Sequence, residues 1–162
     1  MASGDLLAAF EPAGAQYPSS DYAQFDARNG HHVLDFDGSA DESIIWAGWL
    51  SPSYDGGGIT VEIAWASDGT TGDVDWDVAI ETLADGGDDT DSDSFAAANS
   101  TDGTTVPGTS GALKYTTVTF TDGADMDSLG AGDRFRLKLT RDAANDTSTD
   151  DVQVYGVQIT ET

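Results

Sequence analysis

The chain has 162 residues and no cysteine, and 30 aspartates and glutamates against 6 lysines and arginines give it a formal net charge of -24. Six basic side chains are too few to neutralise a run of phosphates, so this composition excludes nucleic acids and anionic membrane surfaces as partners. A hydrophobic fraction of 38% with four tryptophans is too high for a disordered acidic tail, and the length fits one folded domain.

Residues 1 to 30 show aromatic side chains without any periodicity, and we expect them to form an extended N-terminal arm in front of a domain at 31–162. The first ten residues lack a basic segment, which predicts that no secretory signal is present and that the protein is made in the cytoplasm. No apolar run approaches the roughly 18–20 residues that a membrane helix needs.

Alternation of apolar and polar residues dominates the rest of the chain and predicts strands with one buried face. In the clearest segment, Val74, Trp76 and Val78 point one way while Asp75 and Asp77 point the other. Seven segments are expected to be strands: 32–36, 43–50, 59–65, 74–81, 113–121, 135–139 and 152–159.

The connections between these strands are clusters of Gly, Asp, Ser and Thr, which are typical of turns. No long amphipathic helix is predicted, although residues 122–129 can form a single helical turn with Met126 and Leu129 packed against a sheet. Seven or eight strands in one domain of this size predict an all-β antiparallel β-sandwich, with a jelly roll as the favoured topology. The strand order does not follow from the sequence.

Residues 85–111 form a long acidic loop in which Asp89, Asp91 and Asp93 alternate like the opening of a calcium-binding loop. The pattern then fails, because Ser94 replaces the glycine of the sharp turn and Ser100 replaces the bidentate glutamate. A solvated acidic loop is the simpler interpretation, and calcium binding stays open.

Catalytic chemistry finds little support in the residue pattern. With thirty acidic residues, some pair of carboxylates always has a spacing suited to glycoside hydrolysis, so such a pair carries no information. His31 and His32 are the two histidines, and no Gly-x-Ser-x-Gly motif accompanies them. We therefore assign no catalytic, cofactor-binding or metal-binding residue and expect no enzyme activity.

Four tryptophans, Trp46, Trp49, Trp65 and Trp76, can form a sugar-stacking surface if their rings are exposed. Trp65 and Trp76 lie in the inward register of their strands and are expected in the core. Trp46 and Trp49 are three residues apart on one strand, so they point to opposite faces and one of them is expected outside the core. An exposed tryptophan is enriched at subunit contacts, which favours that role over a ligand platform.

Four of the six basic residues lie close together near the C-terminal end: Arg134, Arg136, Lys138 and Arg141. The first three share one strand face and form a basic stripe on an otherwise acidic body. We expect this stripe to pair with acidic side chains, preferably those of the same molecule and otherwise those of a neighbour.

Several segments resemble a group of virion proteins of tailed bacteriophages. They are residues 28–37, 41–43, 54–61, 72–76, 124–129 and 132–137, and the similarity extends over about residues 20–160. The resemblance implies a non-enzymatic jelly-roll decoration (cement) protein on the outer surface of the phage head, which binds the major capsid protein as a homotrimer. It implies no catalytic residue. The alternative is a carbohydrate- or receptor-binding domain of a tail fibre or spike.

Overall fold

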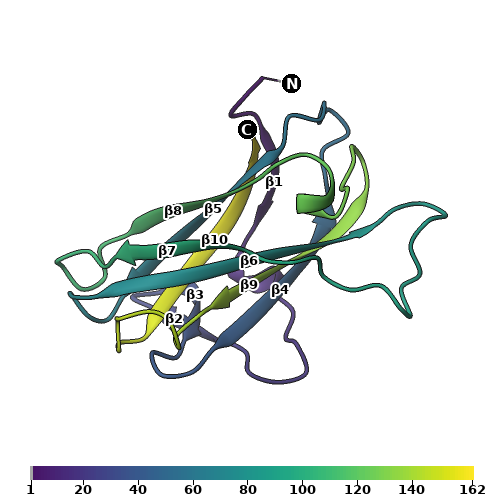
Figure 1. Ribbon diagram of the computed structural model, residues 1–162. Coiled ribbons are helices and arrows are strands. Elements are labelled where there is room, and N and C mark those ends of the chain that lie inside the picture. Colours follow the sequence, from purple (N-terminus) through teal and green to yellow (C-terminus); the bar gives the residue numbers. More distant parts are fainter. Residues whose placement is uncertain (1) are drawn as a thin grey trace.

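Two antiparallel sheets pack face to face in the computed structural model, which describes residues 2–162 (Figure 1). The six-stranded sheet has the order β2-β3-β10-β5-β8, and β1 pairs with β10 beyond the end of β3. The four-stranded sheet has the order β4-β9-β6-β7. All these pairings are antiparallel, so the expected all-β antiparallel sandwich is confirmed.

The ten strands of the described chain are β1 (Leu6–Phe10), β2 (Gln24–Arg28), β3 (His31–Phe36), β4 (Glu42–Trp49), β5 (Ile59–Ser67), β6 (Asp73–Leu83), β7 (Asn99–Thr105), β8 (Lys114–Phe120), β9 (Arg134–Arg141) and β10 (Val152–Glu161). Two short 3-10 helices span Pro12–Gly14 and Ala124–Met126. No helix within residues 2–162 is long and apolar enough to cross a membrane.

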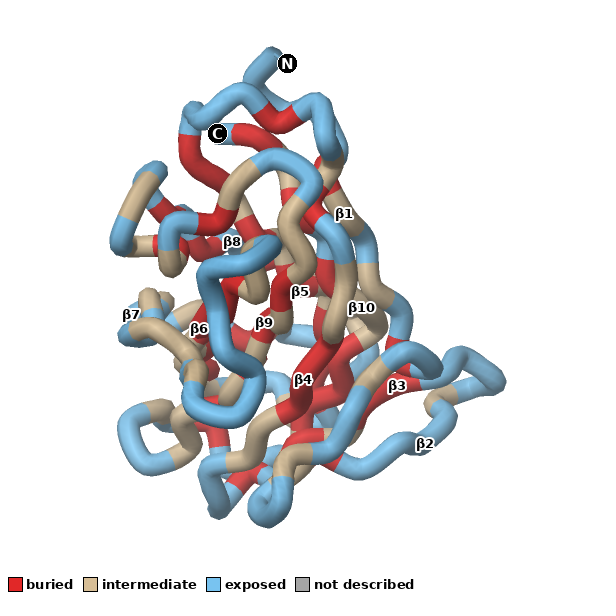
Figure 2. Tube along the Cα trace, turned by 90° about the vertical axis from the view of Figure 1, so that its right-hand side faces the viewer, coloured by how far each residue is buried: buried red, intermediate tan, exposed pale blue. Residues whose placement is uncertain are grey.

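The core lies between the inner faces of the two sheets, where the buried residues concentrate (Figure 2). Trp65 on β5 and Trp76 on β6 meet there edge to face, with ring centroids 6.0 Å apart, and Phe36 contacts Trp76 from β3 at 5.2 Å. Each fully buried side chain of this size contributes roughly 1.5–3 kcal/mol or more through removal of apolar surface from water. Because successive side chains of a strand point to opposite faces, these residues lie on the same face of their sheet.

All seven predicted strands are present. The helical turn expected at residues 122–129 is also present as the second 3-10 helix, with Met126 and Leu129 buried. The strand β7 was missed, because Asn99–Thr105 contains no apolar residue and shows no alternation. It pairs with the edge of β6 through its backbone, so the long acidic loop ends at residue 98.

The N-terminal segment differs from the expected arm, because it is part of the sandwich. Its strands β1 and β2 belong to the six-stranded sheet. Between them, Gln16 exchanges two backbone hydrogen bonds with Ile45 on the open edge of β4. This contact covers an edge that would otherwise offer unpaired backbone groups. The strands are only five residues long, too short to give a periodic signal.

Candidate functional site

The outer face of the six-stranded sheet carries a groove whose floor is made by two small residues. Ala64 on β5 pairs with Tyr115 on β8 at one side and with Gly156 on β10 at the other. Directly paired residues of antiparallel strands point to the same face of the sheet. Because alanine has a small side chain and glycine has none, the sheet surface is uncovered at these two positions, while longer neighbouring side chains project above it. The hollow that results has a volume of about 320 Å³.

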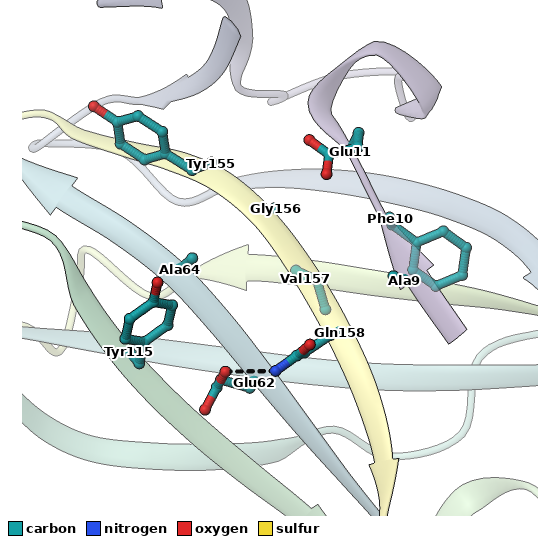
Figure 3. A pocket seen from close by; sticks show the side chains of 10 residues that line it. All are labelled: Ala9, Phe10, Glu11, Glu62, Ala64, Tyr115, Tyr155, Gly156, Val157 and Gln158. Carbon is teal, nitrogen blue, oxygen red and sulfur yellow. Dashed lines mark hydrogen bonds between the residues drawn. The ribbon is translucent and has the colours of Figure 1, made fainter. Parts of the chain in front are cut away.

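Two tyrosines rise beside this floor (Figure 3). Tyr115 is 59% exposed, and Tyr155 is half-buried. Tyr155 lies at a β-bulge, where the register with β5 shifts between Val154 and Gly156. A bulge redirects a side chain relative to the regular strand. Strand β5 lies between β8 and β10, so the two strands that carry the tyrosines lie about 10 Å apart.

A polar pair crosses the groove one row further along. The side-chain amide of Gln158 on β10 donates a hydrogen bond of 2.8 Å to the Glu62 carboxylate on β5 (Figure 3). Gln158 is exposed and Glu62 is half-buried, so both can exchange hydrogen bonds with a ligand in the groove. Within the described lining of the groove there is no basic side chain, and Glu11 contributes a second carboxylate.

The wall opposite Tyr115, beyond Gly156, is formed by the end of β1 and Glu11. Gly156 allows this wall to lie close, because a Cβ atom at position 156 would come within 2.9 Å of the Phe10 carbonyl oxygen. The Phe10 ring points to the core and stacks on Trp46 with centroids 6.1 Å apart. Trp46 also donates its indole N–H to the Glu11 carbonyl over 3.0 Å. The wall is therefore anchored in the core and not loosely attached.

The tryptophans lie as the register predicted. Trp46, Trp65 and Trp76 are fully buried, and Trp49 is 65% exposed on the outer face of the four-stranded sheet. The groove therefore contains no tryptophan.

The histidines do not form a catalytic group in the described structure. His31 and His32 are exposed at the start of β3 and point to opposite faces. His31 lies 6.1 Å from the Tyr155 ring, and His32 lies 5.3 Å from the Phe25 ring.

The acidic loop forms hydrogen bonds within itself. The Asp89 carboxylate accepts the Asp91 backbone N–H at 3.0 Å, and the Asp93 carboxylate accepts the Ser94 N–H at 2.9 Å. Such local bonds stabilise turns. Within residues 2–162 no group of three His, Asp or Glu side chains is arranged to hold a metal ion.

The basic stripe is engaged within the molecule, but among its described contacts only that of Arg136 is with an acidic side chain, whereas acidic partners were expected for all three residues. Arg136 forms an ion pair with Glu81 on the neighbouring β6, and this hydrogen bond raises the pKa of Arg136. Phe95, from the loop between β6 and β7, covers both Arg136 and Lys138 at 4.9 and 5.0 Å from the ring centroid. Arg134 instead lies over the ring of Trp49.

Arg141 differs from the other three, because it faces inward and is fully buried. Its guanidinium donates to the Asp146 carboxylate at 2.8 Å and to four backbone carbonyl groups, those of Phe36, Asp37, Ser148 and Asp150. It joins two loops at one end of the sandwich and has a structural role.

The groove residues were not predicted from the sequence. Tyr115 and Glu62 lie in predicted strands at outward positions, and the glycine after Tyr155 is a signal of a bulge. However, the row from Tyr115 through Ala64 to Gly156 exists only because β8, β5 and β10 are neighbours. These strands are distant in sequence, and their order in the sheet does not follow from the sequence.

No protein-family model and no curated protein matches the sequence. Solved structures do share the fold. A family 35 carbohydrate-binding module from an environmental isolate has a TM-score of 0.52 and 16% identity, with 96% of this chain and 98% of that chain covered. A family 35 module from Cellvibrio japonicus has a TM-score of 0.52 and 13% identity, with 94% and 92% covered.

A third similar structure contains the CBM22-1 and GH10 modules of endo-1,4-beta-D-xylanase 10B from Clostridium thermocellum, complexed with xylohexaose. Its TM-score is 0.54 at 14% identity, and the match covers 100% of this chain but 29% of that chain. The chain thus has the β-sandwich fold of carbohydrate-binding modules, which are non-catalytic domains.

These comparisons contradict the resemblance to phage virion proteins. The similar structures are carbohydrate-binding modules over nearly the whole chain, and nothing in them points to a capsid. The expected decoration of a phage head, with the major capsid protein as partner and a homotrimer as the assembly, is therefore wrong. The segments that carried the resemblance are mostly turns and strand cores, which unrelated β-sandwiches share.

Proposed function

We propose that this protein is a non-catalytic carbohydrate-binding domain and that the groove on the six-stranded sheet binds the glycan. The observation that carries the proposal is the pair Tyr115 and Tyr155 on either side of the low floor at Ala64 and Gly156. The fold shared with carbohydrate-binding modules supports it by analogy.

The groove matches the two kinds of surface of a sugar ring. The faces of a pyranose carry C–H groups, which pack on aromatic rings, and its rim carries hydroxyl groups. Tyrosine offers a rigid ring with a polar tip, so it can serve both. The Glu62 carboxylate accepts hydrogen bonds from hydroxyl groups, and the Gln158 amide can donate and accept them. A few polar groups around an apolar surface are typical of ligand sites.

The shape of this face favours a chain over a single sugar. Tyr155 also lines a second hollow of about 540 Å³ with His31, Leu113 and Arg28. The Arg28 guanidinium there is paired with Asp68 at 3.0 Å and with the Gln153 amide oxygen. Two hollows that meet at one tyrosine can hold consecutive sugars of a polysaccharide.

The arrangement does not favour hydrolysis. A glycosidase needs a carboxylic acid that keeps its proton near neutral pH, which requires an apolar or enclosed site. Glu11 is exposed and Glu62 is only half-buried. Binding without bond cleavage is the function that this groove supports.

The test is isothermal titration calorimetry with xylohexaose, cellohexaose and mannohexaose on the wild type and three groove variants. Tyr115→Ala and Tyr155→Ala each remove one ring, and Ala64→Leu fills the floor. The control is Tyr17→Ala, because Tyr17 is 49% exposed but lies outside the groove. We expect each tyrosine variant to weaken binding about tenfold, the effect of about 1.4 kcal/mol of lost stacking.

Ala64→Leu is expected to abolish binding, and Tyr17→Ala to leave it unchanged. If a hexaose binds but the three groove variants bind as the wild type does, the groove is not the site. If no glycan binds at all, across these and other neutral polysaccharides, the proposed function is wrong.

A further inference from the structure

A second aromatic surface lies on the opposite side of the molecule, on the outer face of the four-stranded sheet. Trp49 at the end of β4 pairs with Arg134 on β9, and Arg134 pairs with Leu83 on β6. These three side chains therefore form one row across the sheet. Single exposed apolar residues are common. Trp49 is different because, with Leu83 and Ala84, it lines a hollow of about 490 Å³.

The indole is held in place at this hollow. The Arg134 guanidinium carbon lies 5.5 Å from the centroid of the Trp49 ring, a cation–π contact that restricts the side chain. The turn beside it is tied to the same strand, because Leu50 N–H donates to the Asp133 carbonyl and Gly132 N–H donates to the Leu50 carbonyl, at 2.9 and 3.2 Å. A preorganised ring loses little entropy when a ligand binds to it.

The rim of the hollow is polar and supplies both donors and acceptors. Asp88 accepts the Ala84 N–H through one carboxylate oxygen at 2.7 Å, and Asp133 accepts the Gly130 N–H through one oxygen at 3.0 Å. The described contacts leave the second oxygen of each carboxylate to solvent or a ligand. Thr90 adds a hydroxyl group, and Arg134 adds N–H donors.

This chemistry is that of a sugar site and not of a protein-docking surface. A stable protein interface buries about 800 Å² on each partner around an apolar centre depleted of charge. Here one indole is surrounded by Asp85, Asp88 and Asp133 within a small hollow. A ligand with one apolar face and a rim of hydroxyl groups fits, and a pyranose has that form.

We propose that Trp49 and the polar rim around it form a second glycan-binding site, independent of the tyrosine groove. The inference rests on the proposed function. Trp49 and the groove lie on the outer faces of different sheets, so one straight stretch of polysaccharide cannot contact both. The protein is then bivalent, and it cross-links chains or gains avidity on a surface that displays many of them.

Tryptophan fluorescence gives a direct test, because the other three tryptophans are fully buried. Acrylamide quenching therefore reports mainly on Trp49. We expect saturating xylohexaose, cellohexaose or mannohexaose to reduce quenching in the wild type. The reduction should persist in the double variant Tyr115→Ala/Tyr155→Ala, in which the groove is lost.

Calorimetry of the same hexaoses gives the number of sites. The wild type should bind two per chain, and Trp49→Ala and the double tyrosine variant should bind one each. Trp49→Tyr keeps a ring and should retain two. Phe25→Ala, which removes another exposed ring at the edge strand β2, is the matched control and should also retain two.

The outcomes separate the two proposals. One site per chain in the wild type, lost in the tyrosine variant and unaffected by Trp49→Ala, overturns the second site and leaves the groove standing. If a saturating hexaose leaves acrylamide quenching unchanged, the second site is likewise overturned. Absence of binding to every glycan tested removes the proposed function, and the second site falls with it.

Discussion

The Gln158 amide and the Glu62 carboxylate meet over 2.8 Å across two neighbouring strands, at the edge of a groove that two tyrosines flank. The bond fixes the position of both side chains at the surface. It aims one carboxylate oxygen at the amide and leaves the other for a ligand. The pair can therefore set the orientation of a sugar that stacks on the tyrosines.

Glu62→Ala tests this role. Loss of a hydrogen bond to a charged group costs roughly 1.5 kcal/mol, so the dissociation constant for a bound hexaose should rise about tenfold. Asp102→Ala is the control, because Asp102 is an exposed carboxylate on the other sheet. Calorimetry on both variants measures the difference. Equal affinity of both variants and the wild type would show that the pair does not contact the ligand.

Charge selectivity follows from the lining of the groove. Its described residues include two glutamates and no basic side chain, and the chain carries -24 overall. A polyanionic glycan should therefore be repelled, whereas a neutral one should bind with little dependence on salt. The measurement is affinity electrophoresis in gels that contain xylan, galactomannan or polygalacturonate. Stronger retardation by polygalacturonate than by the neutral polymers would contradict the expectation.

The buried Arg141 is expected to be essential for stability. Arg141→Met leaves the Asp146 carboxylate and several carbonyl groups without their donor in a buried place, at a cost of about 3–5 kcal/mol. Urea denaturation measures the change. Removal of both charges in Arg141→Met/Asp146→Leu should cost less than Arg141→Met alone, because no unpaired carboxylate remains. A loss below 1 kcal/mol for Arg141→Met would show that the ion pair is dispensable.

Stability should increase in mild acid. Burial raises the pKa of Asp35 and Glu42 above their ordinary values of 3.8 and 4.5. A carboxyl group with a raised pKa in the folded state binds protons more tightly there. Its stabilising contribution is complete below the ordinary pKa and is lost as the pH rises through the folded value. The contribution of these groups to the free energy of unfolding should therefore fall as the pH rises from about 4 through their folded pKa values.

Asp35→Asn isolates one of these groups. The Asp35 carboxylate accepts a 2.7 Å hydrogen bond from the Gln153 amide, and an asparagine oxygen can accept the same bond. The variant should be more stable than the wild type at pH 7 and equal to it near pH 4. Thermal unfolding at both pH values measures this. Asp102→Asn, at an exposed position, should show no such difference, and an equal gain at both pH values for Asp35→Asn would exclude the linkage.

The strands that the sequence predicted are those in which burial on one face enforces alternation. Val74 to Ile80 is the clearest case, since its inward residues are all buried, and Trp76 among them contacts Trp65 on β5 and Phe36 on β3. The missed strands have no such constraint. Asn99–Thr105 pairs at a sheet edge and buries no residue, and Leu6–Phe10 is too short to show a period.

The candidate site was harder to predict than the fold. The three-residue spacing of Trp46 and Trp49 predicted that one of them is exposed, because a strand alternates its faces, but it did not predict that the exposed one is Trp49. The groove depends instead on which strands are neighbours, and Tyr115 and Gly156 are brought to one row only through Ala64. Alternation assigns a residue to a face but does not assign its partner.

The most direct test of the account is a titration of the 15N-labelled protein with a bound hexaose, followed by backbone amide chemical shifts. The account predicts that shifts concentrate at Tyr115, Glu62, Ala64 and Gly156, with a second, separate set around Trp49. Shifts confined to other surfaces, with these amides unmoved at saturation, would contradict glycan binding in the groove.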